Sequence, residues 1–278
     1  MGERRAAPGK VLRITSLANP IVKEIRGLAL AKNRRASGRF VAEGLKLVAD
    51  AADSGWPIRT LVHTAAIGED DRVAGLAAKT RSRGGDIVVV SPAVLAKITR
   101  RDNPQTVIGV FDQKTAPLKA IRPKDDAVWV VLEQARDPGN LGTIVRTVDA
   151  VGGAGVILVG DTVDPFSIEA VRATMGSIFN VTLTRSREEE VLSWMAAWPG
   201  PIVGTHLAAT IDYRRTDYRG PLLLVMGAEQ AGLSPALADA CRRLVKIPMA
   251  GRADSLNLAV ATGVMLFEAA RHRFPIDD

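Results

Sequence analysis

The chain has 278 residues, of which 47% are hydrophobic and 24% charged, a balance that supports one large or two ordinary buried cores and excludes a disordered chain. Its single cysteine, Cys241, excludes an intrachain disulfide framework, and its three histidines lack the spacing of metal ligands, so we expect no metal cofactor. No apolar leader is visible and the longest apolar stretch, 256–267, is shorter than the roughly 20 residues that span a bilayer, so we expect a cytoplasmic protein without a membrane segment.

The net charge of +7 is concentrated in the first part of the chain. Residues 1–115 carry 20 Lys and Arg against 11 Asp and Glu, whereas residues 116–278 carry 17 against 19. This asymmetry is typical of a polyanion-binding front part followed by a near-neutral domain, although a merely solvated basic face gives the same counts. The densest basic run, 32–39, has no aromatic residue that could stack on a base, so it favours contacts to phosphates. The arginines that we expect there are Arg34, Arg35 and Arg39.

The first 112 residues alternate short helices and strands. Asn19 and Pro20 begin a predicted helix, because Asn caps helices and Pro is favoured at the first helical position. The β-branched run 87–90 predicts a buried strand. The other expected elements are strands at 39–42, 58–62 and 106–111 and helices at 43–54 and about 70–83. Together they predict a small α/β domain over residues 1–112.

Residues 113–127 contain two prolines, mixed charge and no periodicity, so we predict that they form a linker. The second predicted domain, 128–278, has short apolar runs separated by helix-length segments, which is typical of a parallel sheet covered by helices on both faces. The runs are 128–132, 156–159, 181–183, 202–204, 222–226 and 244–247. A C-terminal helix is predicted from Ser255 to about Arg273.

Three tight turns, each after an apolar strand, are the candidates for chemistry. The usual dinucleotide, Walker and nucleophile-elbow fingerprints are missing from the sequence, which disfavours an ordinary nucleotide enzyme. The first turn, 137–147, leads into a predicted helix that begins near Asn140 and carries Arg146 nearly two turns inside it. Asn140 could equally be a simple helix cap.

The second turn, 226–234, places two glycines around Glu229, which lets the backbone approach a ligand, although glycine-rich loops after strands are common. The third turn combines 247–251 with Ser255, Leu256 and Asn257. Ser255 is a natural N-cap, and the alternative is a cluster of small polar residues beside a bound ligand.

Taken in order, the three turns make the chain similar to the SpoU/TrmH family of RNA ribose methyltransferases, which belongs to the SPOUT class. The resemblance covers essentially the whole chain. The first family motif resembles Asp137-Pro138-Gly139-Asn140-Leu141-Gly142-Thr143-Ile144-Val145-Arg146-Thr147, the second Val225-Met226-Gly227-Ala228-Glu229 with Gly232-Leu233-Ser234, and the third Ile247-Pro248-Met249 with Ser255-Leu256-Asn257. The front part, from Asn19 through 40–44 to 101–105, is similar to the family's auxiliary substrate-binding domain.

The resemblance implies an α/β SPOUT domain tied in a deep trefoil knot, S-adenosylmethionine as the methyl donor, and a homodimer that completes the site. It implies cofactor contacts from Met226, Gly227, Ile247, Met249, Ser255, Leu256 and Asn257. It implies catalytic roles for Arg146, Asn140, Glu229, Ser255 and Asn257. The small departures from the family pattern, Ala228 with Gln230-Ala231 and Leu258-Ala259-Val260, affect only the detail of the cofactor pocket.

The implied reaction transfers a methyl group from a sulfonium to a ribose 2′-hydroxyl, whose proton must leave as the new bond forms. A free arginine is a poor base because its pKa exceeds about 12. We therefore expect Arg146 to clamp an RNA phosphate and orient the hydroxyl. The expected substrate is 23S or other ribosomal RNA. The alternatives are transfer RNA, methylation of a base, and a non-catalytic RNA-binding ribosome assembly factor.

Overall fold

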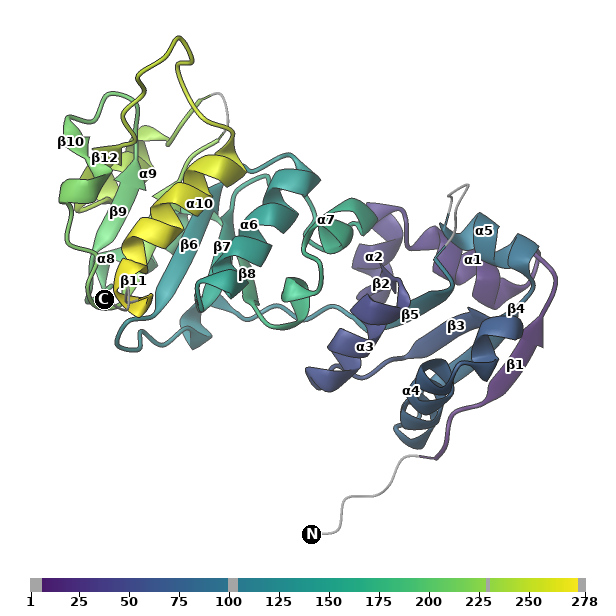
Figure 1. Cartoon of the computed structure of the whole chain (residues 1–278). Helices are drawn as coiled ribbons and strands as arrows, with labels where there is room; N and C mark the ends of the chain where they lie inside the picture. The colour runs from purple at the N-terminus through teal and green to yellow at the C-terminus, as the bar shows by residue number, and fades with distance from the viewer. Residues whose placement is uncertain (1–6, 100–104, 229–230, 275–278) are drawn as a thin grey trace. The chain divides into compact units, whose positions relative to one another are not determined.

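A computed structural model describes residues 7–99, 105–228 and 231–274 of the chain (Figure 1). The chain folds into two compact units. The first consists of residues Met1–Gln113 together with Phe166–Phe179, and the second of Lys114–Pro165 with Asn180–Asp278. No helix among the described residues is both long and apolar enough to cross a bilayer.

The first unit is built on a five-stranded mixed sheet. Its strand order is β1 (Val11–Ile14), β4 (Asp86–Val90), β3 (Thr60–Thr64), β5 (Val107–Asp112) and β2 (Arg39–Glu43). β1, β4 and β3 are parallel, and β5 is antiparallel to both of its neighbours. The helices are α1 (Pro20–Gly27), α2 (Ala31–Ser37), α3 (Leu45–Asp53), α4 (Asp71–Ser82) and α5 (Pro92–Thr99), with a 3-10 turn η1 (Ala66–Glu69).

One face of this sheet is covered by α1 and α5, whose apolar residues share a core with the strands. α1 begins where its sequence predicts, because the Asn19 side chain accepts a hydrogen bond from the Ile21 amide at 2.9 Å and Pro20 occupies the first helical position. α3 and α4 pack against the other face.

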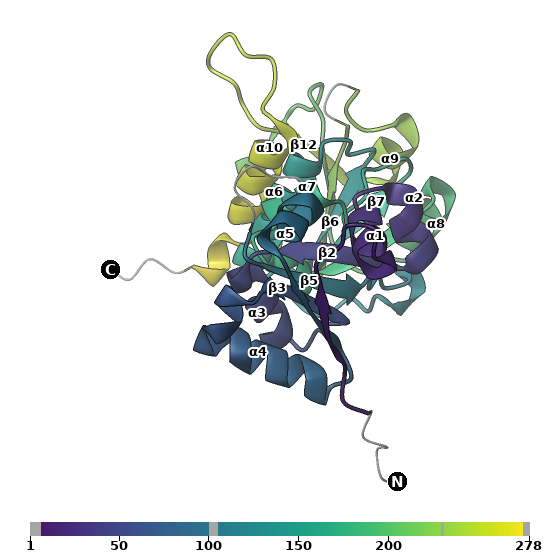
Figure 2. The same cartoon turned by 90° about the vertical axis from the view of Figure 1, so that its right-hand side faces the viewer.

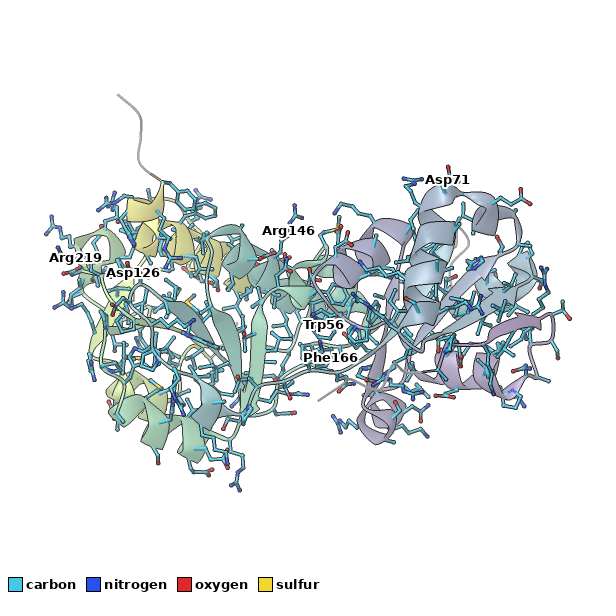
Figure 3. All side chains as sticks on the ribbon, turned by 90° about the horizontal axis from the view of Figure 1, so that it is seen from below. Trp56, Asp71, Asp126, Arg146, Phe166 and Arg219 are labelled. Carbon is cyan, nitrogen blue, oxygen red and sulfur yellow. The ribbon has the colours of Figure 1, made fainter. Side chains whose placement is uncertain are left out.

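An aromatic cluster joins residues 166–179 to that second face. Phe40 of β2 lies 4.9 Å from Phe166 and 6.2 Å from Phe179 between ring centroids, and the Trp56 indole donates a 2.9 Å hydrogen bond to the Phe179 carbonyl. Figure 3 shows Trp56 and Phe166 within this cluster. The segment also carries α7 (Ile168–Ala173) and η3 (Ser177–Phe179). It therefore packs as part of the first unit, whereas the sequence placed it in the second domain.

The second unit is built on a seven-stranded parallel sheet. Its strand order is β10 (Ile211–Asp212), β12 (Arg243–Lys246), β9 (Ile202–Thr205), β11 (Leu222–Met226), β6 (Val128–Glu133), β7 (Gly155–Val159) and β8 (Thr182–Ser186). The central strands β6, β7 and β11 are buried along their whole length, as the continuous apolar runs predict.

Helices cover both faces of the second sheet. α6 (Pro138–Ala150) and α10 (Leu258–Ala269) pack side by side on one face, and α8 (Glu188–Ala196) and α9 (Pro235–Ala240) on the other (Figure 2). The short turns η2 (Leu118–Ala120), η4 (Tyr213–Arg215) and η5 (Arg271–Arg273) complete the unit.

The α/β class of both parts is confirmed, and three local expectations change. Within the predicted linker, η2 packs against β8 and α8, and Ile121 is buried in the core of the second unit. The C-terminal helix begins at Leu258 rather than Ser255. β1 was not predicted, because it is only four residues long and mostly exposed. The trefoil knot that the family resemblance implies stays a prediction.

Candidate functional site

The three turns singled out in the sequence meet at one edge of the second sheet. β6, β11 and β12 are parallel, so their carboxyl ends lie at the same edge, and each of the three strands is followed by one of the turns. β9 lies between β11 and β12 and adds a fourth carboxyl end. This edge is where open parallel sheets bind ligands.

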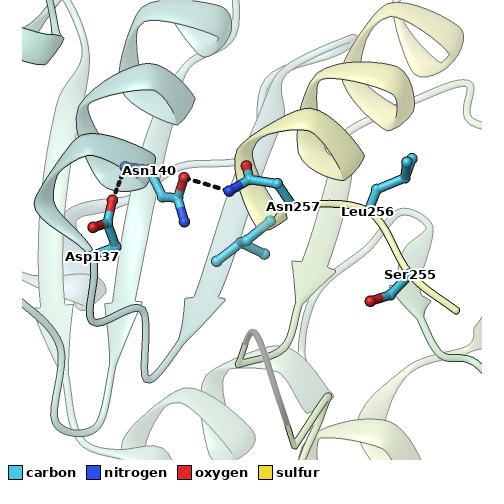
Figure 4. Close-up of a pocket in the computed structure, with 6 residues that line it drawn as sticks. Asp137, Asn140, Ser255, Leu256 and Asn257 are labelled. Carbon is cyan, nitrogen blue, oxygen red and sulfur yellow. Dashed lines mark hydrogen bonds between the residues drawn. The ribbon is translucent and has the colours of Figure 1, made fainter. Parts of the chain in front are cut away.

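A hydrogen-bonded pair of asparagines joins the first and third turns (Figure 4). The Asn257 Nδ2 donates to Asn140 Oδ1 at 2.9 Å, and the Asn257 Oδ1 accepts from the amides of Ala259 and Val260 at 2.9 and 3.3 Å. Because its oxygen is used by the backbone of α10, the Asn257 amide has one orientation, with its nitrogen toward Asn140. The starts of α6 and α10 are therefore tied together.

These contacts also decide which residues cap the two helices. The Asp137 side chain accepts from the Asn140 amide at 2.6 Å and caps α6, and Pro138 is its first residue. Asn257 caps α10. The alternatives in which Asn140 and Ser255 are merely caps are therefore wrong, and both side chains line a cavity instead.

Two adjoining cavities open at this edge. The first cavity is lined by Asp137, Asn140, Ser255, Leu256, Asn257 and Leu258 (Figure 4). The second cavity has a volume of about 470 Å³, and its walls come from the ends of β9, β11 and β12, the 254–256 loop and the start of α10. It is lined by Thr205, His206, Leu207, Met226, Gly227, Ala228, Gly232, Val245, Lys246, Ile247, Pro248, Met249, Asp254, Ser255, Leu256, Leu258 and Ala261.

The predicted cofactor residues lie at these cavities. Met226, Gly227, Ile247 and Met249 line the second, Ser255 and Leu256 line both, and Asn257 lines the first. Glu229 was also predicted and lies outside the described residues. The wall from the end of β9 was not predicted, although the apolar run 202–204 followed by Thr205 was the pattern that could have indicated it.

Gly227 is required by a close approach of the chain. A Cβ at this position would lie 2.1 Å from the Gly232 carbonyl carbon and 2.3 Å from the Leu233 nitrogen. Ala228 and Gly232 exchange two backbone hydrogen bonds of 2.9 Å, which close the second turn on itself. The buried Glu133 carboxylate accepts from the Ser234 amide at 2.8 Å and holds the far end of this turn.

No group of three His, Cys, Asp or Glu in the described ranges could hold a metal ion. Burial raises the pKa of the Cys241 thiol to about 12, and its Sγ donates to the Leu237 carbonyl at 3.1 Å. Cys241 is therefore no nucleophile at neutral pH.

The site agrees with what comparisons with known proteins show. A family model described as the SpoU rRNA Methylase family matches residues 127–267, and one described as an MRM3-like substrate binding domain matches residues 19–109. The chain belongs to the SpoU rRNA methylase family. The family identified from the three motifs is confirmed, and with it the reaction class of RNA methyl transfer.

Relatives of this SpoU protein match nearly the whole of its chain. A crystal structure of an AdoMet-bound rRNA methyltransferase from Sinorhizobium meliloti is 53% identical, covering 95% of this chain and 99% of that one with a TM-score of 0.90. The 23S rRNA (uridine(2479)-2'-O)-methyltransferase of Streptomyces viridochromogenes is 32% identical over 98% of this chain and 95% of its own length. The 23S rRNA (guanosine(2553)-2'-O)-methyltransferase RlmP of Bacillus subtilis is 26% identical over 92% and 98%.

Arg146 of the SpoU motif lies apart from the two cavities. It is exposed on α6 and lines neither of them, and in Figure 3 its side chain projects outward from the helix. Arg146 is six positions after Asn140, which corresponds to about 9 Å along the helix axis and to a different helix face. Within one chain the structure therefore does not bring Arg146 to the pair Asn140–Asn257.

The predicted RNA-contacting arginines of the first unit differ from one another. Arg34 is 3% exposed, and its guanidinium donates to the Leu28 and Ala29 carbonyls at 2.8 and 2.9 Å, which satisfies the C-terminal end of α1. Arg39 forms an ion pair with Glu24 at 3.0 Å. Arg35 is exposed and forms no ion pair with any residue that the structure describes. Burial thus removes Arg34 from the set that can reach a phosphate.

Proposed function

We propose that this SpoU protein transfers a methyl group from S-adenosylmethionine to a ribose 2′-hydroxyl of ribosomal RNA. The observation that carries the proposal is the meeting of the three motif turns at two adjoining cavities. The first turn and the third line the first cavity, where Asn257 is bonded to Asn140, and the second and third turns line the second cavity of about 470 Å³. The named relatives, which are 23S rRNA 2'-O-methyltransferases, support the ribosomal substrate.

The second cavity fits a nucleoside-bearing cofactor. Its volume lies within the roughly 300–1,000 Å³ of ligand pockets, and its walls combine apolar side chains with peptide groups of two turns. Met226, Ile247 and Leu256 would hold the adenine, and the backbone around Gly227 would hydrogen-bond to the polar atoms. When bound, S-adenosylmethionine supplies an electrophilic methyl group on a sulfonium. This donor is the one found with the Sinorhizobium meliloti relative.

The asparagine pair would orient the reacting groups. The single orientation of the Asn257 amide fixes the Asn140 side chain at the mouth of the first cavity, so this polar edge is already arranged before a ligand binds. Ser255 and Glu229 complete the proposed polar set.

A homodimer would bring Arg146 to the site. α10 is apolar on nearly every side, and Val260 and Phe267 on its outer face are 53% and 52% exposed. α10 packs beside α6, where a Cβ on Gly263 would lie 3.9 Å from Thr147, so the apolar face adjoins the helix that carries Arg146. We infer that a second copy covers this face and that its Arg146 clamps the RNA phosphate beside the cavities of the first copy.

The first unit would bind the RNA. We propose residues 1–112 as the substrate-binding domain, with residues 166–179 packed onto it, and 128–278 as the methyltransferase domain after the connecting stretch 113–127. Arg35 is the exposed member of the predicted arginine set, and Arg39 would contribute after separation from Glu24. A ribosomal RNA substrate implies a cytoplasmic location.

The experiment maps ribose methylation across total RNA from a deletion strain, the wild type, and the deletion strain carrying Asn140→Ala. One ribosomal ribose is expected to lose its methyl group in the deletion strain and to regain little of it with the variant. Loss of a mark in transfer RNA alone would overturn the ribosomal substrate. An unchanged map, together with no binding of S-adenosylmethionine by calorimetry, would favour a non-catalytic assembly factor.

A further inference from the structure

We propose that His206 is a cofactor-binding residue, whose Nε2–H donates a hydrogen bond to the nucleoside portion of the methyl donor. The inference rests on the proposed function and adds to it a side chain from outside the three motifs. His206 follows β9 and is one of the residues that line the second cavity.

The backbone around His206 is held on both sides. Its amide donates to the Val245 carbonyl of β12 at 3.0 Å, and its carbonyl accepts from the Ala209 amide at 3.1 Å. Ala209 is itself buried, 8% exposed. The position of the residue is thus fixed by the neighbouring strand and by the following turn.

The ring is fixed as well, and so is its proton. The His206 Nδ1 lies 3.1 Å from the Ala208 amide nitrogen, and this amide can only donate. Nδ1 must therefore be the acceptor, so the neutral imidazole carries its hydrogen on Nε2. The half-buried ring accordingly offers the cavity a donor.

Few other uncharged donors among the described lining residues are available for that task. The Thr205 hydroxyl already donates to the Met226 sulfur at 3.6 Å. Ser255 lies on the loop before α10, at the part of the cavity that adjoins the asparagine pair. His206 follows β9, which lies between β11 and β12. These two neighbouring strands are followed by the second and third motif turns.

The acceptor is assigned to the nucleoside from these neighbours. The lining that β11 and β12 contribute around Gly227 and Ile247 includes Met226, Pro248 and Met249, and this apolar stretch suits an adenosine rather than a zwitterionic amino acid, although Lys246 and Asp254 also line the cavity. Ribose hydroxyl oxygens and adenine ring nitrogens both accept hydrogen bonds from a ring N–H. A donor held in place before binding loses little freedom when the ligand arrives.

The test measures affinity by calorimetry for S-adenosylmethionine and for 5′-methylthioadenosine, which lacks the amino-acid portion. His206→Phe keeps a flat ring without the donor, and we expect it to weaken binding of both ligands about tenfold, the loss of one hydrogen bond. His206→Gln, whose amide nitrogen sits near the Nε2 position, is expected to stay within about threefold of the wild type. His272→Phe, on the exposed turn η5, is the control and should bind both ligands normally.

Wild-type affinity of His206→Phe for both ligands would overturn the proposal, and so would weakening confined to S-adenosylmethionine, which would place the contact at the amino-acid end. Nitrogen-15 spectra of the free protein should show the His206 hydrogen on Nε2, and its signal should shift when 5′-methylthioadenosine is added. A hydrogen on Nδ1 would also overturn it. Failure of the wild type to bind either ligand would instead reject the proposed function.

Discussion

Asn140 and Asn257 are separated by 117 positions in the sequence and share one hydrogen bond of 2.9 Å. Neither the pairing of these two residues nor the orientation of the Asn257 amide could be predicted from the sequence, because a hydrogen bond between two loops depends on the fold that brings the loops together. Both residues line a cavity, and the catalytic roles expected for them stay predictions, whereas the residues that cap α6 and α10 were not predicted. The pair Asp137-Pro138 fits the pattern of an N-cap followed by proline, so the start of α6 could have been found from the sequence.

Asn257→Asp should separate stability from activity. An aspartate keeps the oxygen that caps α10, so we expect the free energy of unfolding to stay within about 0.5 kcal/mol of wild type. It loses the donor to Asn140, whose amide must turn over to bond with the carboxylate, so the polar edge is rearranged and methyl transfer should fall at least about tenfold. Denaturant unfolding and single-turnover methylation measure the two effects.

Asn140→Asp is the matched control, since a carboxylate still accepts from the Asn257 Nδ2. Equal loss of methyl transfer in both variants would show that the hydrogen bond between residues 140 and 257 is not the cause of the loss.

Arg146→Lys should lower methyl transfer at least about tenfold while leaving the affinity for S-adenosylmethionine unchanged. A lysine keeps the charge but loses the planar, two-pronged contact to a phosphate. Calorimetry and turnover on ribosomal RNA give the two values. Near-normal turnover would show that the guanidinium geometry is not needed.

Arg34→Ala and Arg35→Ala should have opposite consequences. Removal of Arg34 leaves the Leu28 and Ala29 carbonyls without their buried donor, so we expect the unfolding free energy to fall by about 2 kcal/mol. Removal of the exposed Arg35 should leave stability unchanged and weaken RNA binding, with a smaller dependence of affinity on salt. Thermal unfolding and binding titrations at two salt concentrations distinguish the variants. An unchanged salt dependence in Arg35→Ala would contradict a phosphate contact.

At the scale of elements, the strands of the second sheet were predicted well because they are continuous apolar runs. The segment 166–179 was assigned to the second domain because Phe166 and Phe179 look like any other buried residues in a sequence. Their packing against Phe40 makes the segment part of the first unit instead. Residues 113–127 looked like a linker because proline and charge hide the packing of Leu118 and Ile121 against the core of the second unit.

Arg172→Met should destabilise the first unit by about 3 kcal/mol. The Arg172 guanidinium of α7 donates to the Glu43 carboxylate of β2 at 2.5 and 3.1 Å, and the Glu43 side chain is only 2% exposed. Loss of the guanidinium removes two charge-assisted hydrogen bonds from a buried carboxylate. The double variant with Glu43→Gln should recover most of the loss in a denaturant titration. A double variant no more stable than Arg172→Met would argue against a charge effect.

At the scale of the whole molecule, two folded units and the family were predicted, whereas the number of copies is not determined by one chain. Phe267→Glu places a charge on the exposed apolar face of α10, so we expect it to convert a dimer to a monomer and to abolish methyl transfer. Light scattering after size exclusion measures the mass. A monomeric wild type that is fully active would contradict the proposed role of a second copy.

Methyl transfer itself offers the most direct measurement. Ribosomal RNA from a deletion strain is incubated with the protein and S-adenosylmethionine labelled in its methyl group, and the RNA is digested to nucleosides. The proposed chemistry predicts that the label appears in one 2′-O-methylated nucleoside and that Asn257→Asp transfers little of it. Label in a methylated base would contradict the proposed chemistry. So would RNA that carries no label although the protein binds S-adenosylmethionine.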